Sequence, residues 1–104
     1  MERYQAIGAI ETFGLVYALE AADAMVKASD VEVIAYVNTA SGYIAVIVQG
    51  ETAACKTAVD AGVLAVEKLG TEVYSKVVIP GPHEDLRKII DRYSLSLMFP
   101  DEAN

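Results

Sequence analysis

The sequence predicts a domain of the α+β class, in which helices and strands alternate along a chain of 104 residues. Two long segments repeat apolar residues at the helical period, and four short segments are rich in Val, Ile and Tyr, as strands are. The length matches one domain with a single hydrophobic core. The elements below follow from these two patterns.

The first strand is expected over residues 4–11, with Gly8 marking the close approach of another element. A helix is expected next, capped by Thr12 and closed by Ser29 and Asp30. Its expected apolar stripe recurs at helical spacing and consists of Leu15, Ala18, Leu19, Ala22, Met25 and Val26.

Two strands are expected at residues 31–38 and 43–50, with only a few residues between them. A second helix is expected over residues 53–69, with Gly62 in close contact with the sheet or the other helix and Gly70 ending it. A fourth strand at 72–80 ends at Pro80, and a short helix is expected within residues 83–93. The last residues show no clear period and are interpreted as a tail.

This order, β-α-β-β-α-β plus a C-terminal helix, predicts a ferredoxin-like arrangement. Such a domain has an antiparallel four-stranded sheet with both long helices on one face. The other face and the strand edges then need a further covering.

Composition narrows the class of protein. Hydrophobic residues make up 54% of the chain and charged residues 22%, a surplus that suggests a subunit interface. There is no apolar run of about 18 residues and no apolar segment long enough for a signal peptide, so we expect a soluble intracellular protein without a membrane partner. The net charge of −7 argues against nucleic acid as a partner.

Residues suited to catalysis are few. The single Cys55 falls on the apolar stripe of the second helix, where a buried thiol is expected, and one cysteine forms no internal disulfide. The single His83 follows Pro82 at the start of the last helix, where capping or packing is favoured over general-base catalysis. We therefore expect no catalytic residue, no metal and no cofactor.

One stretch calls for an explanation of its own. Asn38, Thr39, Ala40, Ser41 and Gly42 form a loop of small and polar residues between two apolar strands. From the residues alone, a plain hairpin turn and a functional loop are both open.

Three stretches together resemble a known family. They are "GAIETFGLVYALEAADAMVKASDVEVIAY", "SGYIAVIVQGETAACKTAVDAG" and "VVIPGPHEDLRKII", in order from about residue 4 to residue 90. They are similar to the hexamer-forming shell proteins of bacterial microcompartments, which include propanediol- and ethanolamine-utilization and carboxysome shell proteins. On this basis residues 1–90 are assigned to a BMC-type shell domain and residues 91–104 to a C-terminal tail.

The resemblance implies a structural protein located in a microcompartment in the cytoplasm. Six subunits would form a flat ring, and rings would tile with one another and with other shell paralogues around encapsulated enzymes. Residues 38–42 would line a pore on the six-fold axis for small metabolites, and Ala40 and Ser41 are small enough for six copies to approach that axis. Six Ser41 hydroxyls would suit polar or anionic solutes.

The resemblance also assigns an edge between hexamers, made of Lys27, Asp30, Gly81 and His83. Lys27 matches the family's edge lysine, although a solvated lysine at a helix end is the simpler interpretation of the residue alone. Gly81 stands where relatives have Arg, so a guanidinium contact is missing. We expect Asp30 to offset this loss by pairing with a Lys27 across the edge.

Two other functions remain open from the residues. A ferredoxin-like domain of the ACT type can serve as a small ligand-binding regulatory module, usually as a dimer, since fold does not fix function. A small enzyme would need His83 as its base. The mass of the oligomer separates the first alternative from a hexamer.

Overall fold

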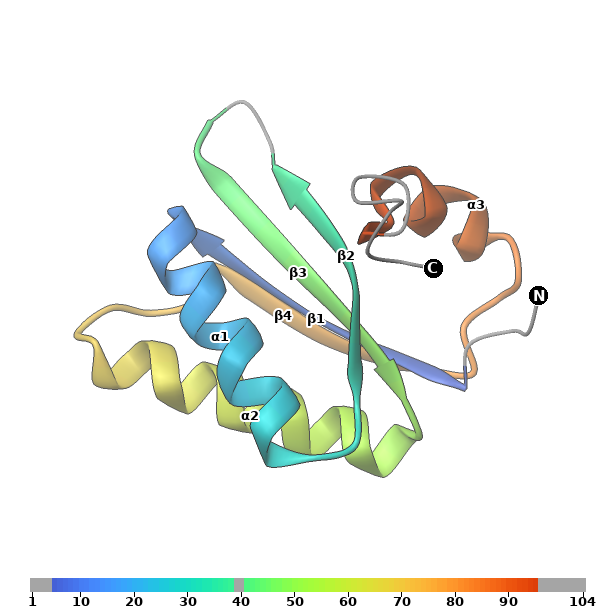
Figure 1. The fold of residues 1–104 in the computed structure, drawn as a ribbon, viewed down its shortest axis with the longest axis horizontal. Coiled ribbons are helices and arrows are strands. Elements are labelled where there is room, and N and C mark those ends of the chain that lie inside the picture. Colours follow the sequence, from blue (N-terminus) through green and yellow to red (C-terminus); the bar gives the residue numbers. More distant parts are fainter. Residues whose placement is uncertain (1–4, 39–40, 96–104) are drawn as a thin grey trace.

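The computed structural model describes residues 5–38 and 41–95. Its four strands form one antiparallel sheet in the order β2-β3-β1-β4 (Figure 1). Their bounds are β1 Ala6–Phe13, β2 Glu32–Asn38, β3 Tyr43–Gly50 and β4 Ser75–Pro80. The predicted α+β class and its four-stranded antiparallel sheet are confirmed.

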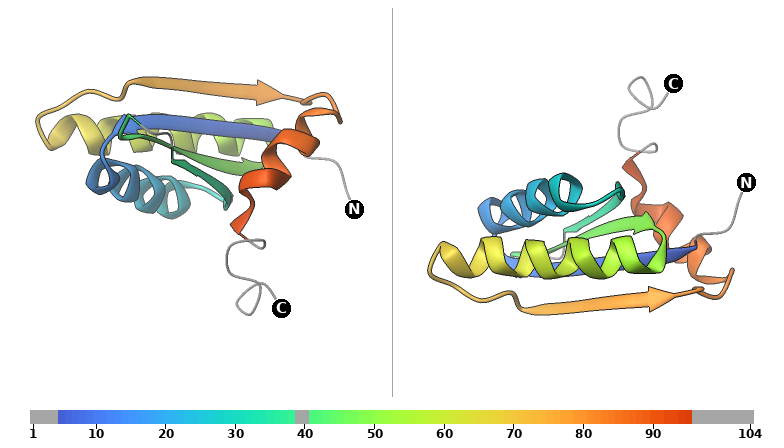
Figure 2. Two further views of the ribbon diagram at one scale, coloured as in Figure 1. Left: turned by 90° about the horizontal axis from the view of Figure 1, so that it is seen from above. Right: turned by 90° about the horizontal axis from the view of Figure 1, so that it is seen from below.

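Helices cover the two faces of this sheet unequally. The long helices, α1 (Leu15–Ala28) and α2 (Thr52–Lys68), lie on one face, as expected (Figure 2). The short helix α3 (Leu86–Ile90) and the 3-10 turn η1 (Asp91–Tyr93) lie against the other. None of the helices within the described ranges is long and apolar enough to cross a membrane.

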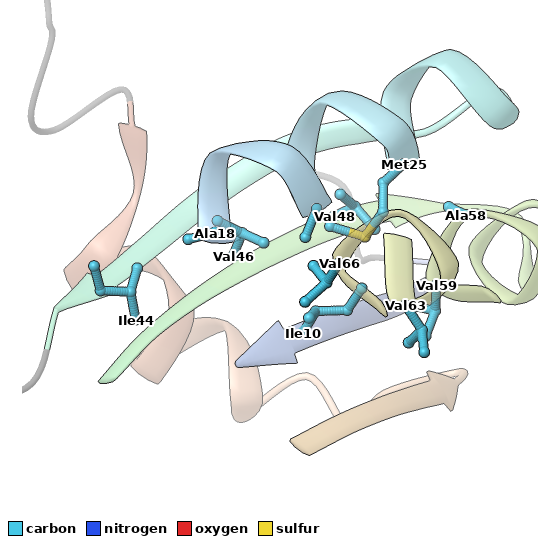
Figure 3. Close-up of a cluster of buried hydrophobic side chains, with 11 residues drawn as sticks. Ile10, Ala18, Met25, Ile44, Val46, Val48, Ala58, Val59, Val63 and Val66 are labelled. Atoms are coloured by element: carbon cyan, nitrogen blue, oxygen red, sulfur yellow. The ribbon is translucent and has the colours of Figure 1, made fainter. Parts of the chain in front are cut away.

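The main core lies between the sheet and the long helices (Figure 3). Alternate residues of the two central strands, such as Ile10, Val46 and Val48, point toward these helices, because successive strand side chains take opposite faces. From the helices the core receives Ala18, Ala21, Met25, Ala58, Val59, Val63 and Val66. Small residues on α1 let it approach the sheet and α2 closely.

Two glycines permit this close packing, as their positions in the sequence suggested. A Cβ on Gly8 would lie 2.8 Å from Val59 Cγ2 on α2. A Cβ on Gly62 would lie 2.5 Å from Ile10 Cδ1 and 2.9 Å from Met25 Cγ. Gly62 therefore sits where α2 touches both β1 and α1. Gly70 has φ +91° just after α2, which fits its predicted role in ending the helix.

A second, smaller cluster covers part of the opposite face. Ile90 of α3 is 5% exposed and packs with Ile7 and Ala35. The chain then meets the edge strand β2, where Ser94 and Ala35 form an isolated antiparallel bridge. The rest of the tail, residues 96–104, lies outside the described residues. The C-terminal helix thus supplies some of the covering that this face was expected to need.

Three local predictions were wrong. The fourth strand begins at Ser75 rather than at residue 72. Thr12 does not cap α1: it belongs to β1, is 1% exposed, and donates its hydroxyl hydrogen to the Gly14 carbonyl at 3.1 Å. Gly14 precedes the first helical residue, with φ +110°. The predicted apolar stripe of α1 is also only partly buried, because Leu15 and Leu19 are exposed while Ala21 is buried.

Candidate functional site: the tip of the β2–β3 hairpin

The hairpin between β2 and β3 carries the candidate pore loop. Asn38 ends β2, pairs with Ile44 across the ladder, and is exposed. Ser41 is exposed as well, whereas Thr39 and Ala40 lie outside the described residues. Gly42 has φ +86°, a backbone conformation that residues with a side chain rarely adopt. The glycine therefore sets the geometry with which the loop enters β3.

The Gly42 side of this loop is fixed to the junction between β1 and α1. The Gly14 backbone N–H donates to the Gly42 carbonyl at 2.9 Å. The Phe13 ring lies over Gly42, since a Cβ built there would be 3.4 Å from Phe13 Cε2. In the sheet, Phe13 stands directly opposite Tyr43. The C-terminal end of the loop is thus attached to the end of β1, next to Tyr43, where β3 begins.

Three aromatic rings form a row beside this junction, which we call the aromatic row: Phe13, Tyr43 and Tyr74. The ring centroids of Phe13 and Tyr43 are 5.1 Å apart in an edge-on arrangement, and those of Tyr43 and Tyr74 are 4.4 Å apart. The Tyr74 backbone N–H donates to the Glu11 carbonyl at 2.8 Å. Phe13 and Tyr74 are 63% and 64% exposed, so the row is a surface feature.

The predicted edge residues lie at the other end of the domain. Phe13 pairs with Tyr43 at the loop end of the sheet, whereas Ala6 pairs with both Gly50 and Pro80 at the opposite end. Gly81 directly follows Pro80. Because α1 starts beside Phe13 and runs for 14 residues, its last turn with Lys27 also reaches the far end. Figure 1 shows the end of β2 and the start of β3 on the opposite side of the molecule from the C-terminal end of α1.

Lys27 has a partner within its own helix. Its Nζ lies 2.8 Å from Asp23 Oδ2, one turn earlier, and both side chains are largely exposed. The hydrogen bond to Asp23 and the charge of that carboxylate raise the pKa of Lys27 above its ordinary value. The lysine is thus held as a cation at the end of α1.

Asp30, three residues after Lys27 in the chain, lines an acidic hollow. This hollow has a volume of about 500 Å³ and lies where α1 ends and α2 begins. Its lining includes three carboxylates, Asp30, Glu32 and Glu51, together with Gln49, whose side-chain amide donates to Glu32 at 2.8 Å. The hollow therefore carries negative charge.

Gly81 and His83 follow β4. Gly81 has φ +55° with open space around its Cα, and its N–H donates to the Gln5 carbonyl at 2.8 Å. His83 is exposed, and its Nδ1 accepts a hydrogen bond from the Asp85 backbone N–H at 3.0 Å, in the turn that leads into α3. The bond lies in the turn before α3, whose N-cap residue is Asp85 and which has no side-chain capping bond.

The described residues contain no cluster suited to a metal ion, and the cysteine is buried. Within 5–38 and 41–95, no three His, Cys, Asp or Glu side chains gather as a metal site would require. Cys55 is fully buried, as predicted, and its burial raises the pKa of the thiol above the ordinary value of 9.0. Its thiol is therefore protonated and shielded at neutral pH.

Sequence reasoning did not find the aromatic row. Because Thr12 resembles a helix cap, the sequence places Phe13 in the helix and not in the first strand. The available signal was the period of two in a strand, which places Ile7, Ala9, Glu11 and Phe13 on one face. This period continues the strand beyond Glu11 and pairs Phe13 with Tyr43.

Comparison with known proteins identifies the class to which this fold and loop belong. The model of the BMC domain matches residues 6–82. The bacterial microcompartment shell protein PduA of Citrobacter freundii is 47% identical over 85% of this chain and 94% of its own length. EutM of Escherichia coli, also a microcompartment shell protein, is 46% identical over 82% of this chain and 87% of its own. A carboxysome shell protein of Hydrogenovibrio crunogenus is 42% identical over 82% of this chain and 88% of its own length.

The fold has a match among solved structures too. A microcompartment protein of Desulfitobacterium hafniense superimposes with a TM-score of 0.75 at 31% identity, over 85% of this chain. The chain spans about half the length of that protein, 49%. Together with the sequence matches, these findings show that the chain belongs to the BMC domain family.

Proposed function

We propose that this chain is a structural shell protein of a bacterial microcompartment. Six copies close into a ring around the hairpin tip, and the rings tile through the opposite end of the domain into a facet. The observation that carries the proposal is the separation of the two sets of residues. A loop of small residues is at one end of the sheet, and Lys27 and Gly81 are at the other. The named relatives are shell proteins.

The surface of the single chain supports assembly. Large apolar side chains are exposed on α1 and β4 in a chain that is otherwise well packed. Examples are Val16 at 70%, Leu19 at 59% and Val77 at 46% exposure. Exposed apolar side chains on these elements fit contacts with other subunits. Because a ring uses two different surfaces of each subunit, exposure on both a helix and the sheet fits a cyclic oligomer.

The proposed pore has a chemical character set by its described residues. Asn38 and Ser41 offer an amide and a hydroxyl, and each would be repeated six times around the axis. Neither side chain is charged or large. We expect such an opening to pass small polar metabolites and to exclude bulky ones.

Solution mass tests the ring. Six chains of 11.1 kDa make 66.6 kDa, and light scattering of the purified protein should give this mass. A dimer would instead support the small regulatory module. A monomer at micromolar concentration would refute the ring.

A substitution at the tip tests the pore. Ser41→Leu should leave the ring mass unchanged and slow the turnover of an enzyme enclosed in assembled shells, because six isobutyl groups would crowd the axis. Ser41→Ala is the matched control, since it stays small and should keep turnover near that of the parent. Broken shells should show equal turnover for all three. Equal turnover in intact shells would contradict a pore at Ser41.

A further inference from the structure

We infer that the aromatic row positions the pore loop and thereby sets the opening, rather than merely adding stability to the sheet. This inference rests on the proposed function, because it concerns the same hairpin tip. It assigns a role to Phe13, Tyr43 and Tyr74, none of which belongs to the loop itself.

The first step is the asymmetry of the two ends of the loop. On the Gly42 side, a backbone hydrogen bond from Gly14 and the Phe13 ring both hold the chain. On the Asn38 side, the chain belongs to β2, which has β3 as its one neighbour in the sheet of described residues. The position of Ser41 is therefore governed mainly from the Gly42 side.

The second step is that Gly42 depends on Phe13 for its place. With φ +86° and no side chain, Gly42 has more backbone freedom than any other residue would have there. The bond from the Gly14 N–H to the Gly42 carbonyl limits that freedom. The Phe13 ring, paired with the ring of the next residue Tyr43, bounds the space beside Gly42, since a Cβ built there would already touch it at 3.4 Å. Ser41, the neighbour of Gly42 in the chain, is restrained as a result.

The third step is that the row is anchored at both of its ends. Phe13 is held by the turn at Gly14, where the buried Thr12 hydroxyl donates to the Gly14 carbonyl. Tyr74 is held by its backbone bond to Glu11. Tyr43 lies between these two rings. Aromatic pairs at such distances add to stability beyond the area they bury, so the row resists displacement of any one ring.

The exposure of Phe13 and Tyr74 in the single chain argues for positioning over core packing. Phe13 and Tyr74 are more than half exposed, so they contribute little to the buried core. Removing the Phe13 ring should therefore loosen the tip without unfolding the domain. That separation allows a direct test.

Hydrogen exchange measures the loosening. In Phe13→Ala, the amides of Gly14 and residues 41–43 should exchange roughly 2- to 10-fold faster than in the parent, the range that one aromatic contact implies. The amides of residues 44–50 should keep their parental rates. Phe13→Tyr should restore the rates, because it keeps the ring. Tyr93→Ala, which removes an exposed aromatic side chain on η1, is the matched control and should change none of them.

Cross-linking measures the consequence at the axis. In a Ser41→Cys background, mild oxidation joins neighbouring subunits only when two loops come together, and the buried Cys55 does not compete. A loosened loop visits shorter separations, so adding Phe13→Ala should raise the cross-linking rate several-fold. Tyr74→Ala should act in the same direction with a smaller effect, because Tyr74 reaches Gly42 only through Tyr43 and Phe13.

The outcomes separate this inference from the proposed function. If the parent forms no 66.6 kDa ring, the proposed function fails. If the ring forms and Phe13→Ala changes neither exchange nor cross-linking, or accelerates exchange equally through β1 and β3, the positioning role is overturned. It is also overturned if Phe13→Ala and Tyr74→Ala both abolish the ring, because the row would then act in assembly.

Discussion

At the scale of single residues, Gly62 shows how contact between layers outweighs local propensity. A glycine in mid-helix costs about 1 kcal/mol relative to alanine. Here the missing Cβ leaves room for Ile10 from the sheet and Met25 from α1. The Ala21 carbonyl oxygen would lie 3.3 Å from an added Cβ, so the backbone of α1 blocks it as well. The residue thus lets α2 lie against two elements at once.

We expect Gly62→Ala to lower the free energy of unfolding by about 1–3 kcal/mol, the usual cost of overfilling a packed core. Helix propensity alone would predict a gain. Chemical denaturation at one fixed protein concentration measures the change. Thr57→Ala, at an exposed position of the same helix, is the control and should shift stability by less than about 0.5 kcal/mol. A more stable Gly62→Ala variant would show that the contact is loose.

At the scale of elements, the C-terminal helix α3 belongs to the domain rather than to a loose end. Its Ile90 is 5% exposed and packs on Ile7 and Ala35, on the sheet face that α1 and α2 leave open. The neighbouring Ile89 is 59% exposed. Two residues of one type, adjacent in sequence, therefore face different surroundings.

This pair gives a matched experiment. Ile90→Ala should cost about 2–4 kcal/mol, because it deletes buried methyl groups and leaves a cavity. Ile89→Ala should cost less than about 0.5 kcal/mol in a single folded chain. Denaturant titration under dilute conditions compares the two variants. Similar losses for both, or none for Ile90→Ala, would mean that α3 is detached in solution.

Elements also show what sequence reasoning could reach. The strand at residues 43–50 was predicted with the bounds that the structure gives, because a nearly continuous apolar run between two turn signals leaves little choice. The sheet topology followed from element order alone. Both depend on local pattern and on general rules of connection.

Other features depend on tertiary contacts that a local pattern does not contain. The hydroxyl of Thr12 serves a strand end instead of a helix start, and only the pairing of Phe13 with Tyr43 reveals the difference. Likewise, α1 has an apolar side wider than the stripe it buries, so Leu15 and Leu19 remain exposed. The loop could be located from its composition, but its attachment to Gly14 and Phe13 could not.

At the scale of the whole molecule, net charge bears on the proposed assembly. Six chains of net charge −7 would carry −42 together, so rings would repel one another unless specific edge contacts acted against the repulsion. Lys27, held beside Asp23, is a cation at the proposed edge. Asp30, three residues further along the chain, lines an acidic hollow, where a neighbour's lysine would find opposite charge.

Reversing this charge separates a specific contact from general repulsion. Asp30→Lys and Glu67→Lys change the net charge equally, but Glu67 is exposed near the C-terminal end of α2 and does not line the hollow. If Asp30 pairs with a neighbour's Lys27, Asp30→Lys should reduce sheet formation several-fold, while Glu67→Lys should not reduce it. Sedimentation and electron microscopy at 0.1 M salt compare the variants, with ring mass checked for each. Sheets from Asp30→Lys that match the parent would exclude the pairing.

The ladder register has a consequence for how such chains diversify. β1 spans eight residues, about 24 Å, between the hairpin tip and the far end that follows Pro80. Residues at the hairpin tip are thus remote from residues at the far end. The two sets of residues can therefore change independently in evolution. Relatives that kept the same residues at the far end while altering the hairpin tip could assemble into one lattice. Such a facet would contain pores of different solute selectivity.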